Sequence, residues 1–253
     1  MRIWLAPWPL LLLVIDGCDA LFGLDHVGPN HDAVIGATDA GFSCKDRASA
    51  RFVCADFDDA TEVVYTSGLA VPLPMMGSNV DVARRAPSVS PPNALWIDTS
   101  GGTYVAQING TGSVHRLHGA LDVDFSRFDA DDATAFFVLG NRNGAFDHCY
   151  VQLGVETGPR LNVMSHCGSP DVNHYTDVLA QLPAGGTFVH LDFVVDTSTG
   201  TADAIVSGST MVRLDLGFSS QQGGTAHVEF GVLDAIPAPG PRVAIDNIEV
   251  TVE

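Results

Sequence analysis

The sequence predicts an all-β domain folded as a two-sheet antiparallel β-sandwich. Five short segments alternate apolar and polar residues with a period of two, namely 121–125, 189–195, 212–216, 228–232 and 248–252. This alternation is typical of strands that bury one face and leave the other to solvent. Turn-forming residues separate the segments, and helical periodicity is nearly absent. The spacing of short strands and turns favours a sandwich over a helical or mixed fold.

Residues 1–17 have the pattern of a signal peptide. Arg2 is followed by an apolar run, Leu10–Ile15, and by Gly17 directly before Cys18. The run is too short for a membrane-spanning helix, which needs about 20 residues. The stretch before Cys18 resembles a bacterial lipobox, although Asp16 is unusual in it. We therefore expect lipidation at Cys18, with ordinary cleavage nearby as the alternative, and an exported protein attached to the bacterial envelope, on the periplasmic or cell-surface side, through lipid alone.

A tether is expected over residues 18–43, which mix Gly, Ala, Asp and His without sustained periodicity. The domain itself is expected over 44–253. If Cys18 carries lipid, an even set of cysteines remains for disulfides in an exported chain: Cys44, Cys54, Cys149 and Cys167. Three pairings are possible. We favour the two local ones, Cys44–Cys54 and Cys149–Cys167, because the second pair brackets an apparent hairpin that turns at Gly158-Pro159.

Inside the domain the elements follow in order. A first strand lies within Arg51–Asp59, and the proline-rich stretch Leu69–Pro92 reads as a surface excursion without central strands. Tyr175–Leu182 is the one segment that favours a helical turn, just before a proline. A three-strand meander covers Phe188–Leu216, with turns at 196–200 and 207–209, and Ile245–Val250 closes the domain.

The first strand, the meander and the closing strand resemble those of concanavalin A-like, laminin-G-like jelly rolls, which are frequent on exported bacterial lipoproteins. The resemblance covers Arg51–Val252. It implies that the first and last strands pair, so that Val53–Phe57 and Ile245–Val250 are neighbours. Members of this group include glycan-binding modules, glycoside hydrolases and domains of unknown role. The fold therefore does not choose a function by itself.

The acidic composition excludes one class of function and suggests one cofactor. The formal net charge is −18, from 30 Asp+Glu against 12 Lys+Arg. Nucleic-acid binding relies on basic side chains, so no nucleic-acid partner is expected. Solubility outside the cell accounts for the excess of acid. A structural calcium is the alternative, because calcium takes six to eight oxygen ligands. Its candidate ligands are Asp129, Asp131, Asp132 and Asp246.

Four residues are candidates for ligand binding. Tyr150 and Tyr175 lie beside the predicted 149–167 hairpin, and aromatic faces are common in sugar sites. Asp122 and Asp124 share one strand face with His118, which forms either a sugar groove or an ordinary solvated surface. Trp96 lies among apolar residues and is expected in the core.

Catalytic motifs are missing from the sequence. The five glutamates do not form the Glu-x-Asp-x-x-Glu strand of retaining glycosidases on this fold, and no Gly-x-Ser-x-Gly elbow or phosphate loop occurs. We expect a non-catalytic binding domain with extracellular glycan as its leading ligand. A structural or protein-interaction domain, with an envelope protein as partner, is the alternative, and a glycoside hydrolase is the least favoured.

Overall fold

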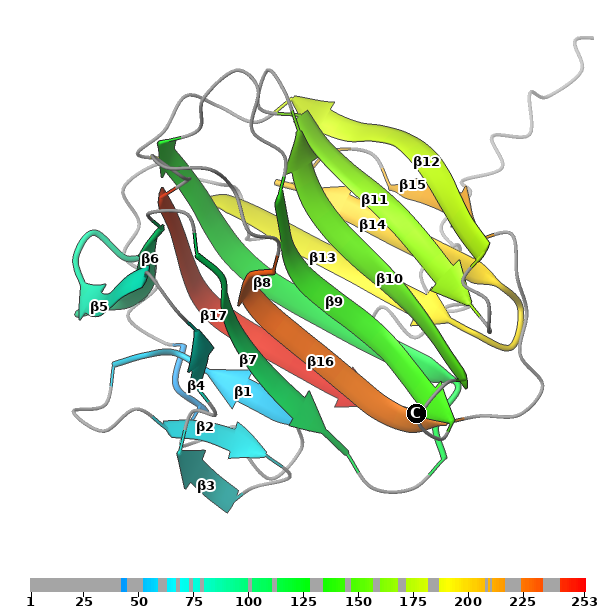
Figure 1. The fold of residues 1–253 in the computed structure, drawn as a ribbon, viewed down its shortest axis with the longest axis horizontal. Coiled ribbons are helices and arrows are strands. Elements are labelled where there is room, and N and C mark those ends of the chain that lie inside the picture. Colours follow the sequence, from blue (N-terminus) through cyan, green and yellow to red (C-terminus); the bar gives the residue numbers. More distant parts are fainter. Residues whose placement is uncertain are drawn as a thin grey trace, which may run out of the picture. The chain divides into compact units, whose positions relative to one another are not determined.

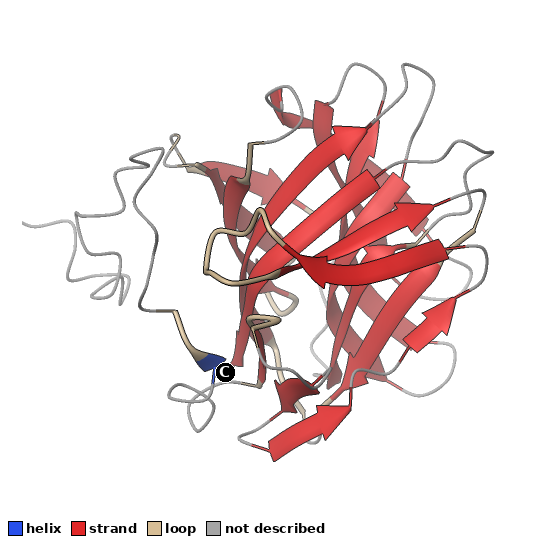
Figure 2. Cartoon of the chain, turned by 90° about the vertical axis from the view of Figure 1, so that its left-hand side faces the viewer, coloured by secondary structure: helices blue, strands red, loops and turns tan. Residues whose placement is uncertain are grey.

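The computed structural model describes residues 42–44, 52–58, 63–66, 69–72, 75–77, 80–99, 102–110, 113–127, 134–143, 147–156, 160–167, 172–181, 187–207, 209, 211–216, 224–233 and 242–253. These residues form two antiparallel sheets that pack as a sandwich, so the predicted fold class is confirmed. Figure 2 shows that strands dominate the described part of the chain. No helix among the described residues is long and apolar enough to cross a membrane.

Sheet A is the larger sheet. In spatial order it contains β15 (Val212–Asp215), β14 (Thr201–Val206), β13 (Val189–Asp196), β8 (Arg116–Arg127), β17 (Arg242–Val252), β1 (Val53–Ala55), β2 (Val63–Thr66) and β3 (Leu69–Pro72). Strand β6 (Ala94–Thr99) also pairs with β17, and β5 (Val80–Arg85) pairs with β6.

Sheet B lies over the other side of the core. Its order is β12 (Val172–Gln181), β11 (Arg160–Cys167), β10 (Asp147–Glu156), β9 (Thr134–Asn143), β16 (Thr225–Val232), β7 (Tyr104–Asn109) and β4 (Met75–Gly77). In Figure 1 strands β12 to β7 run side by side in front of β13, β8 and β17.

Alternation along the strands fills the core between the sheets. From sheet A, Leu121 and Val123 are fully buried, and from sheet B so are Val228 and Phe230. The five segments predicted from alternation lie in β8, β13, β15, β16 and β17. Most of their apolar positions are buried because successive side chains of a strand alternate between its two faces, whereas Val212 and Val252 are 39% and 37% exposed.

The first and last strands pair as the resemblance implies. Val53 lies opposite Val250, and Ala55 lies opposite Ile248. This contact joins the two ends of the domain in the middle of sheet A, with β17 between β1 and β8.

One prediction about elements was wrong, and a second was right only in that the proline-rich stretch has no central strands. Residues 175–181 are strand, because β12 pairs with β11 on both sides of a register shift: Tyr175 lies opposite Met164, and Ala180 lies opposite Leu161. Weak local propensity is overruled by this ladder. The stretch Leu69–Pro92 contains β3, β4 and β5, which lie at sheet margins where proline and missing neighbours are tolerated. It is also not wholly superficial, since Ser90 is only 1% exposed.

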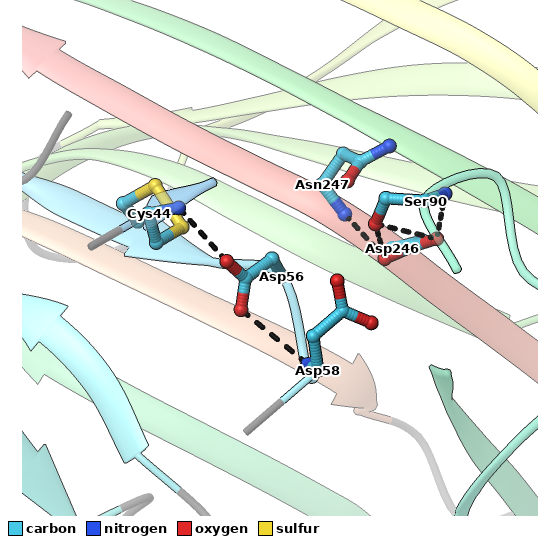
Figure 3. Close-up of a disulfide and its surroundings, with 7 residues drawn as sticks. Cys44, Asp56, Asp58, Ser90, Asp246 and Asn247 are labelled. Carbon is cyan, nitrogen blue, oxygen red and sulfur yellow. Dashed lines mark hydrogen bonds between the residues drawn. A yellow bond between two sulfur atoms is a disulfide. The ribbon is translucent and has the colours of Figure 1, made fainter. Parts of the chain in front are cut away.

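The Cys44–Cys54 disulfide is present and ties the start of the domain to β1 (Figure 3). Asp56 supports the same end, because its Oδ2 accepts a hydrogen bond from the Cys44 backbone N–H at 2.8 Å. Cys149 is also disulfide-bonded, and the β10–β11 ladder places it directly opposite Cys167. The Cys167 side chain, residues 1–41 with Cys18, and nearly all of the expected tether lie outside the described residues.

Candidate functional site

The structure places the predicted ligand-binding residues on opposite outer faces of the sandwich. Asp122 and Asp124 are on β8 and point away from the core, because Leu121 and Val123 fill it. Tyr150 points away from the core on β10, beside the buried Val151. The four residues therefore do not form one site. The register puts Tyr175 on the same face as Tyr150, although its side chain lies outside the described part.

The outer face of sheet A is not a solvated surface around the two aspartates. Asp122 is 6% exposed and Asp124 is 1% exposed. A small apolar cluster of Ala94, Trp96 and Ala244, with Phe188 packed against it, lies on the same face. The expectation that this face is either an open groove or the wet side is therefore wrong for these carboxylates. A ligand cannot reach them in this conformation.

Trp96 is buried as predicted, and it holds the segment that follows β5. Its indole Nε1–H donates to the carbonyl oxygens of Arg85 and Pro87, at 3.0 and 3.2 Å. The Arg85 guanidinium lies 5.2 Å from the ring centroid, within reach of a cation–π interaction. The side chain is thus structural in this position.

Asp122 is held from two sides. His190 Nδ1 is 2.9 Å from its Oδ1, and Asn247 Nδ2 donates to its Oδ2 at 2.8 Å. Burial lowers the pKa of His190, but the hydrogen bond and the negative charge of Asp122 outweigh that effect, so the pKa is raised. A second pair, His118 with Asp192 at 2.8 Å, lies between the same two strands. These contacts join β8, β13 and β17.

Asp246 is fully buried and is surrounded by donors (Figure 3). Its Oδ2 accepts from the backbone N–H groups of Val89 and Ser90 at 2.8 and 3.0 Å, and its Oδ1 accepts from the N–H of Asn247 at 2.9 Å. Burial raises the pKa of Asp246 to about 8, with repulsion from Asp122 adding to it and these hydrogen bonds opposing it. The carboxyl group fixes residues 89–90 onto sheet A.

These contacts bear on the expected calcium ligands. The two oxygens of Asp246 already accept hydrogen bonds from three N–H groups. Because these donors point at the oxygens, the arrangement does not favour a cation beside them. The described residues contain no group of three or more His, Cys, Asp or Glu arranged for a metal ion. Asp129, Asp131 and Asp132 lie outside the described residues. Calcium binding therefore stays a prediction.

Two rows of residues, most of them polar or aromatic, lie in register across the strands of sheet B. The first row runs from β7 to β12 through Asn109, His227, Gly140, Tyr150, His166 and Asn173. The second runs beside it through Gln107, Glu229, Val138, Gln152, Met164 and Tyr175. We call these two rows the sheet B face. Its strands can be followed in Figure 1.

An aromatic pair lies near the middle of the sheet B face. The rings of Tyr150 and His166 stack, with centroids 4.6 Å apart and an angle of 21° between the planes. Tyr150 is half-buried, whereas His166 is 8% exposed. Gly140 is required beside them, because a Cβ there would lie 2.2 Å from the Cys149 carbonyl oxygen and 2.4 Å from Tyr150 Cα. The absence of a side chain on β9 thus lets β10 approach closely.

A hydrogen-bonded group occupies the β7–β16 end of the same face. His227 is 4% exposed, and its ring lies between two acceptors: Nδ1 is 2.7 Å from Asn109 Oδ1, and Nε2 is 2.9 Å from Glu229 Oε1. Gln107 Nε2 also donates to Glu229 Oε1 at 2.9 Å. Because each group fixes the next, these polar side chains are preorganised.

Sequence reasoning missed most of this face. The alternation of His227 and Glu229 shows that both point to one side of their strand, but nothing local shows that β7 lies next to β16 or that β9 separates them from Tyr150. Asn109 and His227 are 118 residues apart in sequence. A pattern of short polar side chains at alternate positions was the only available signal.

Comparison with known proteins shows the fold and no family. No family model matches the chain, and no curated protein matches it. Solved structures do match. Alginate lyase vAL-1 from Chlorella virus is 9% identical, with a TM-score of 0.53 over 70% of this chain and 91% of that one. Botulinum neurotoxin type C, whose cell entry depends on interaction with two ganglioside molecules, is 12% identical, with a TM-score of 0.53 over 83% of this chain and 50% of that one.

A third similar structure carries a sugar. Domain 4 of an extracellular arabinanase from Geobacillus stearothermophilus, in complex with arabinotriose, is 17% identical, with a TM-score of 0.50 over 80% of this chain and 92% of that one. The neighbours are thus β-sandwiches that include both carbohydrate-binding domains and enzymes. At these identities the likeness concerns the fold alone.

Proposed function

We propose that this chain is a non-catalytic glycan-binding protein of the bacterial envelope, attached through lipid on Cys18, and that the sheet B face holds the glycan. One observation carries the proposal: the half-buried Tyr150, stacked on His166, lies on the same face as the hydrogen-bonded polar side chains of β7 and β16. Sugar sites combine an aromatic surface with a few fixed polar groups, and this face has both.

Two further considerations support the same reading. The buried carboxylates of sheet A are held by His190, Asn247 and backbone N–H groups, which suits a structural role. Among the fold's neighbours, one was solved with arabinotriose and another depends on gangliosides for cell entry. A protein ligand is the competing possibility for the same face, since the binding domain of a further botulinum toxin was solved with rat synaptotagmin II.

The test is a glycan array probed with the purified protein, followed by calorimetry on the glycans that bind. Tyr150→Ala should weaken binding at least about tenfold, because stacking on a sugar and the polar contacts it orients are lost together. His118→Ala is the matched control, since it removes an exposed ring from the outer face of the other sheet. Equal binding by wild type and Tyr150→Ala would move the site elsewhere, and no bound glycan would favour the protein partner.

The anchor and the lack of catalysis have their own tests. Mass spectrometry of the mature N-terminus should find a diacylglyceryl group on Cys18. Incubation of the protein with each glycan that it binds should leave the glycan intact by chromatography. Release of shorter products that is lost in His227→Gln would make the protein an enzyme.

A further inference from the structure

We infer that the ligand of the sheet B face is a chain of several sugar units lying across the strands, and not a single sugar held at one point. The inference rests on the proposed function and names its ligand class. It follows from the distance between two different kinds of contact on one face. A single sugar ring cannot reach both.

The two ends of the face differ in chemistry. At the β7–β16 end the groups are amides, an imidazole and a carboxylate, linked by hydrogen bonds through His227 and Glu229. At the β10–β11 end the half-buried Tyr150 presents aromatic surface, and the buried His166 stacks against it. Polar groups of the first kind bind sugar hydroxyls, and rings of the second kind pack against sugar carbons.

Strand β9 separates these ends and contributes little that could bind. Its two residues in the rows are Gly140, which has no side chain, and Val138, which is apolar and 4% exposed. Neighbouring strands lie about 4.8 Å apart, so the backbones of His227 and Tyr150 are roughly 10 Å apart. A ligand that contacts both ends must bridge that distance.

The register also gives the direction and the extent of the ligand. From the exposed Asn109 on β7 to the half-buried Tyr150 on β10, the first row crosses three strand spacings, or about 14 Å. Contacts on such a row add along a line perpendicular to the strands. Joining the two ends in one ligand makes the second contact intramolecular, and this raises affinity beyond that of either end alone.

The experiment is a length series on a glycan array and by calorimetry, using arabino-oligosaccharides, oligo-alginates and fragments of bacterial polysaccharides, each from one to six units. Affinity should rise at least about tenfold between one unit and the length that spans both ends, and then level off. Tyr150→Ala and Asn109→Ala should each weaken binding of the long chain. A short ligand should respond to one variant and not to the other.

Controls keep folding and binding apart. Thermal unfolding should show each variant folded, with Tyr150→Leu as the replacement if Tyr150→Ala is not, and His118→Ala should leave the whole series unchanged. A single sugar that binds as tightly as a hexamer, and responds to both variants, would overturn this inference while leaving glycan binding intact. Binding to no member of any series would overturn the proposed function itself.

Discussion

Replacement of Asp246 by Asn should change how the stability of the protein depends on pH. Asp246 is fully buried beside Asp122, and its pKa is raised from the ordinary 3.8 to about 8. A carboxyl group with a raised pKa contributes stability that is fully present below its unfolded pKa, and that contribution is lost as pH rises through its folded pKa. Between these values the unfolded chain releases the proton and the folded chain keeps it.

The size of the effect follows from the same two values. Each pKa unit corresponds to about 1.4 kcal/mol, so the free energy of unfolding should fall by about 1.4 kcal/mol per pH unit between about pH 4 and 8 because of this group. The sum over the interval is on the order of 5 kcal/mol as an upper limit. Asn cannot ionise, so the variant lacks this slope whatever its absolute stability.

The assay is urea unfolding followed by Trp96 fluorescence at half-unit steps from pH 5 to 9. The quantity to compare is the difference in the free energy of unfolding between wild type and Asp246→Asn, because other groups titrate equally in both. The pKa of His190 is also raised, so stability falls with the same sign above its ordinary pKa of 6.5, but this fall occurs in both proteins and cancels in the difference. A difference that stays constant from pH 5 to 8 would refute the reasoning, since Asp246 would then be ionised in the folded protein.

Three further predictions concern single contacts. Gly140→Ala should destabilise the protein by about 2–4 kcal/mol in urea unfolding and weaken glycan binding, because the new Cβ would meet the backbone of β10 at 2.2–2.4 Å and displace Tyr150; an unchanged unfolding midpoint would contradict this. Replacing Cys44 and Cys54 by Ser should cost about 2–3 kcal/mol in the same assay, and reducing agent should then have no further effect at this bridge. Trp96→Phe removes two hydrogen bonds to residues 85–87 and should cost about 1–3 kcal/mol, with faster amide exchange in that segment than in β8.

The strands could be predicted from the sequence because the residue types along each strand alternate with the burial of its two faces. Val228 and Phe230 are apolar because they face the core, and Glu229 is polar because it does not. The helical turn expected near Tyr175 failed for the opposite reason. That segment has weak local preference, and its pairing with β11 decides its conformation.

Only some residues of the candidate site could be predicted from the sequence. Tyr150 was selected for its place beside a predicted hairpin, but its partner His166 comes from the facing strand, and His227 comes from a strand far along the chain. Asp122 and Asp124 were selected because they share a strand face. The sequence could not show that residues 85–93, Trp96 and Phe188 cover that face of sheet A.

The sequence by itself determined the fold class of this protein, because alternation shows which side of each strand faces the core. Its acidic composition predicts no nucleic-acid partner, and its local cysteines favour short disulfide loops. The tertiary structure alone decided which outward-facing residues are covered: Asp122 on sheet A and His227 on sheet B are both buried, whereas Tyr150 and Asn109 on sheet B reach solvent. Alternation of apolar and polar residues shows that a side chain points away from the core between the sheets. It does not show whether another segment covers that side chain. On sheet A, the segment that Asp246 and Trp96 hold by hydrogen bonds lies on the outer face. On sheet B, the outer face consists of two rows of residues from six strands. Backbone hydrogen bonds between segments distant in sequence bring these rows into register.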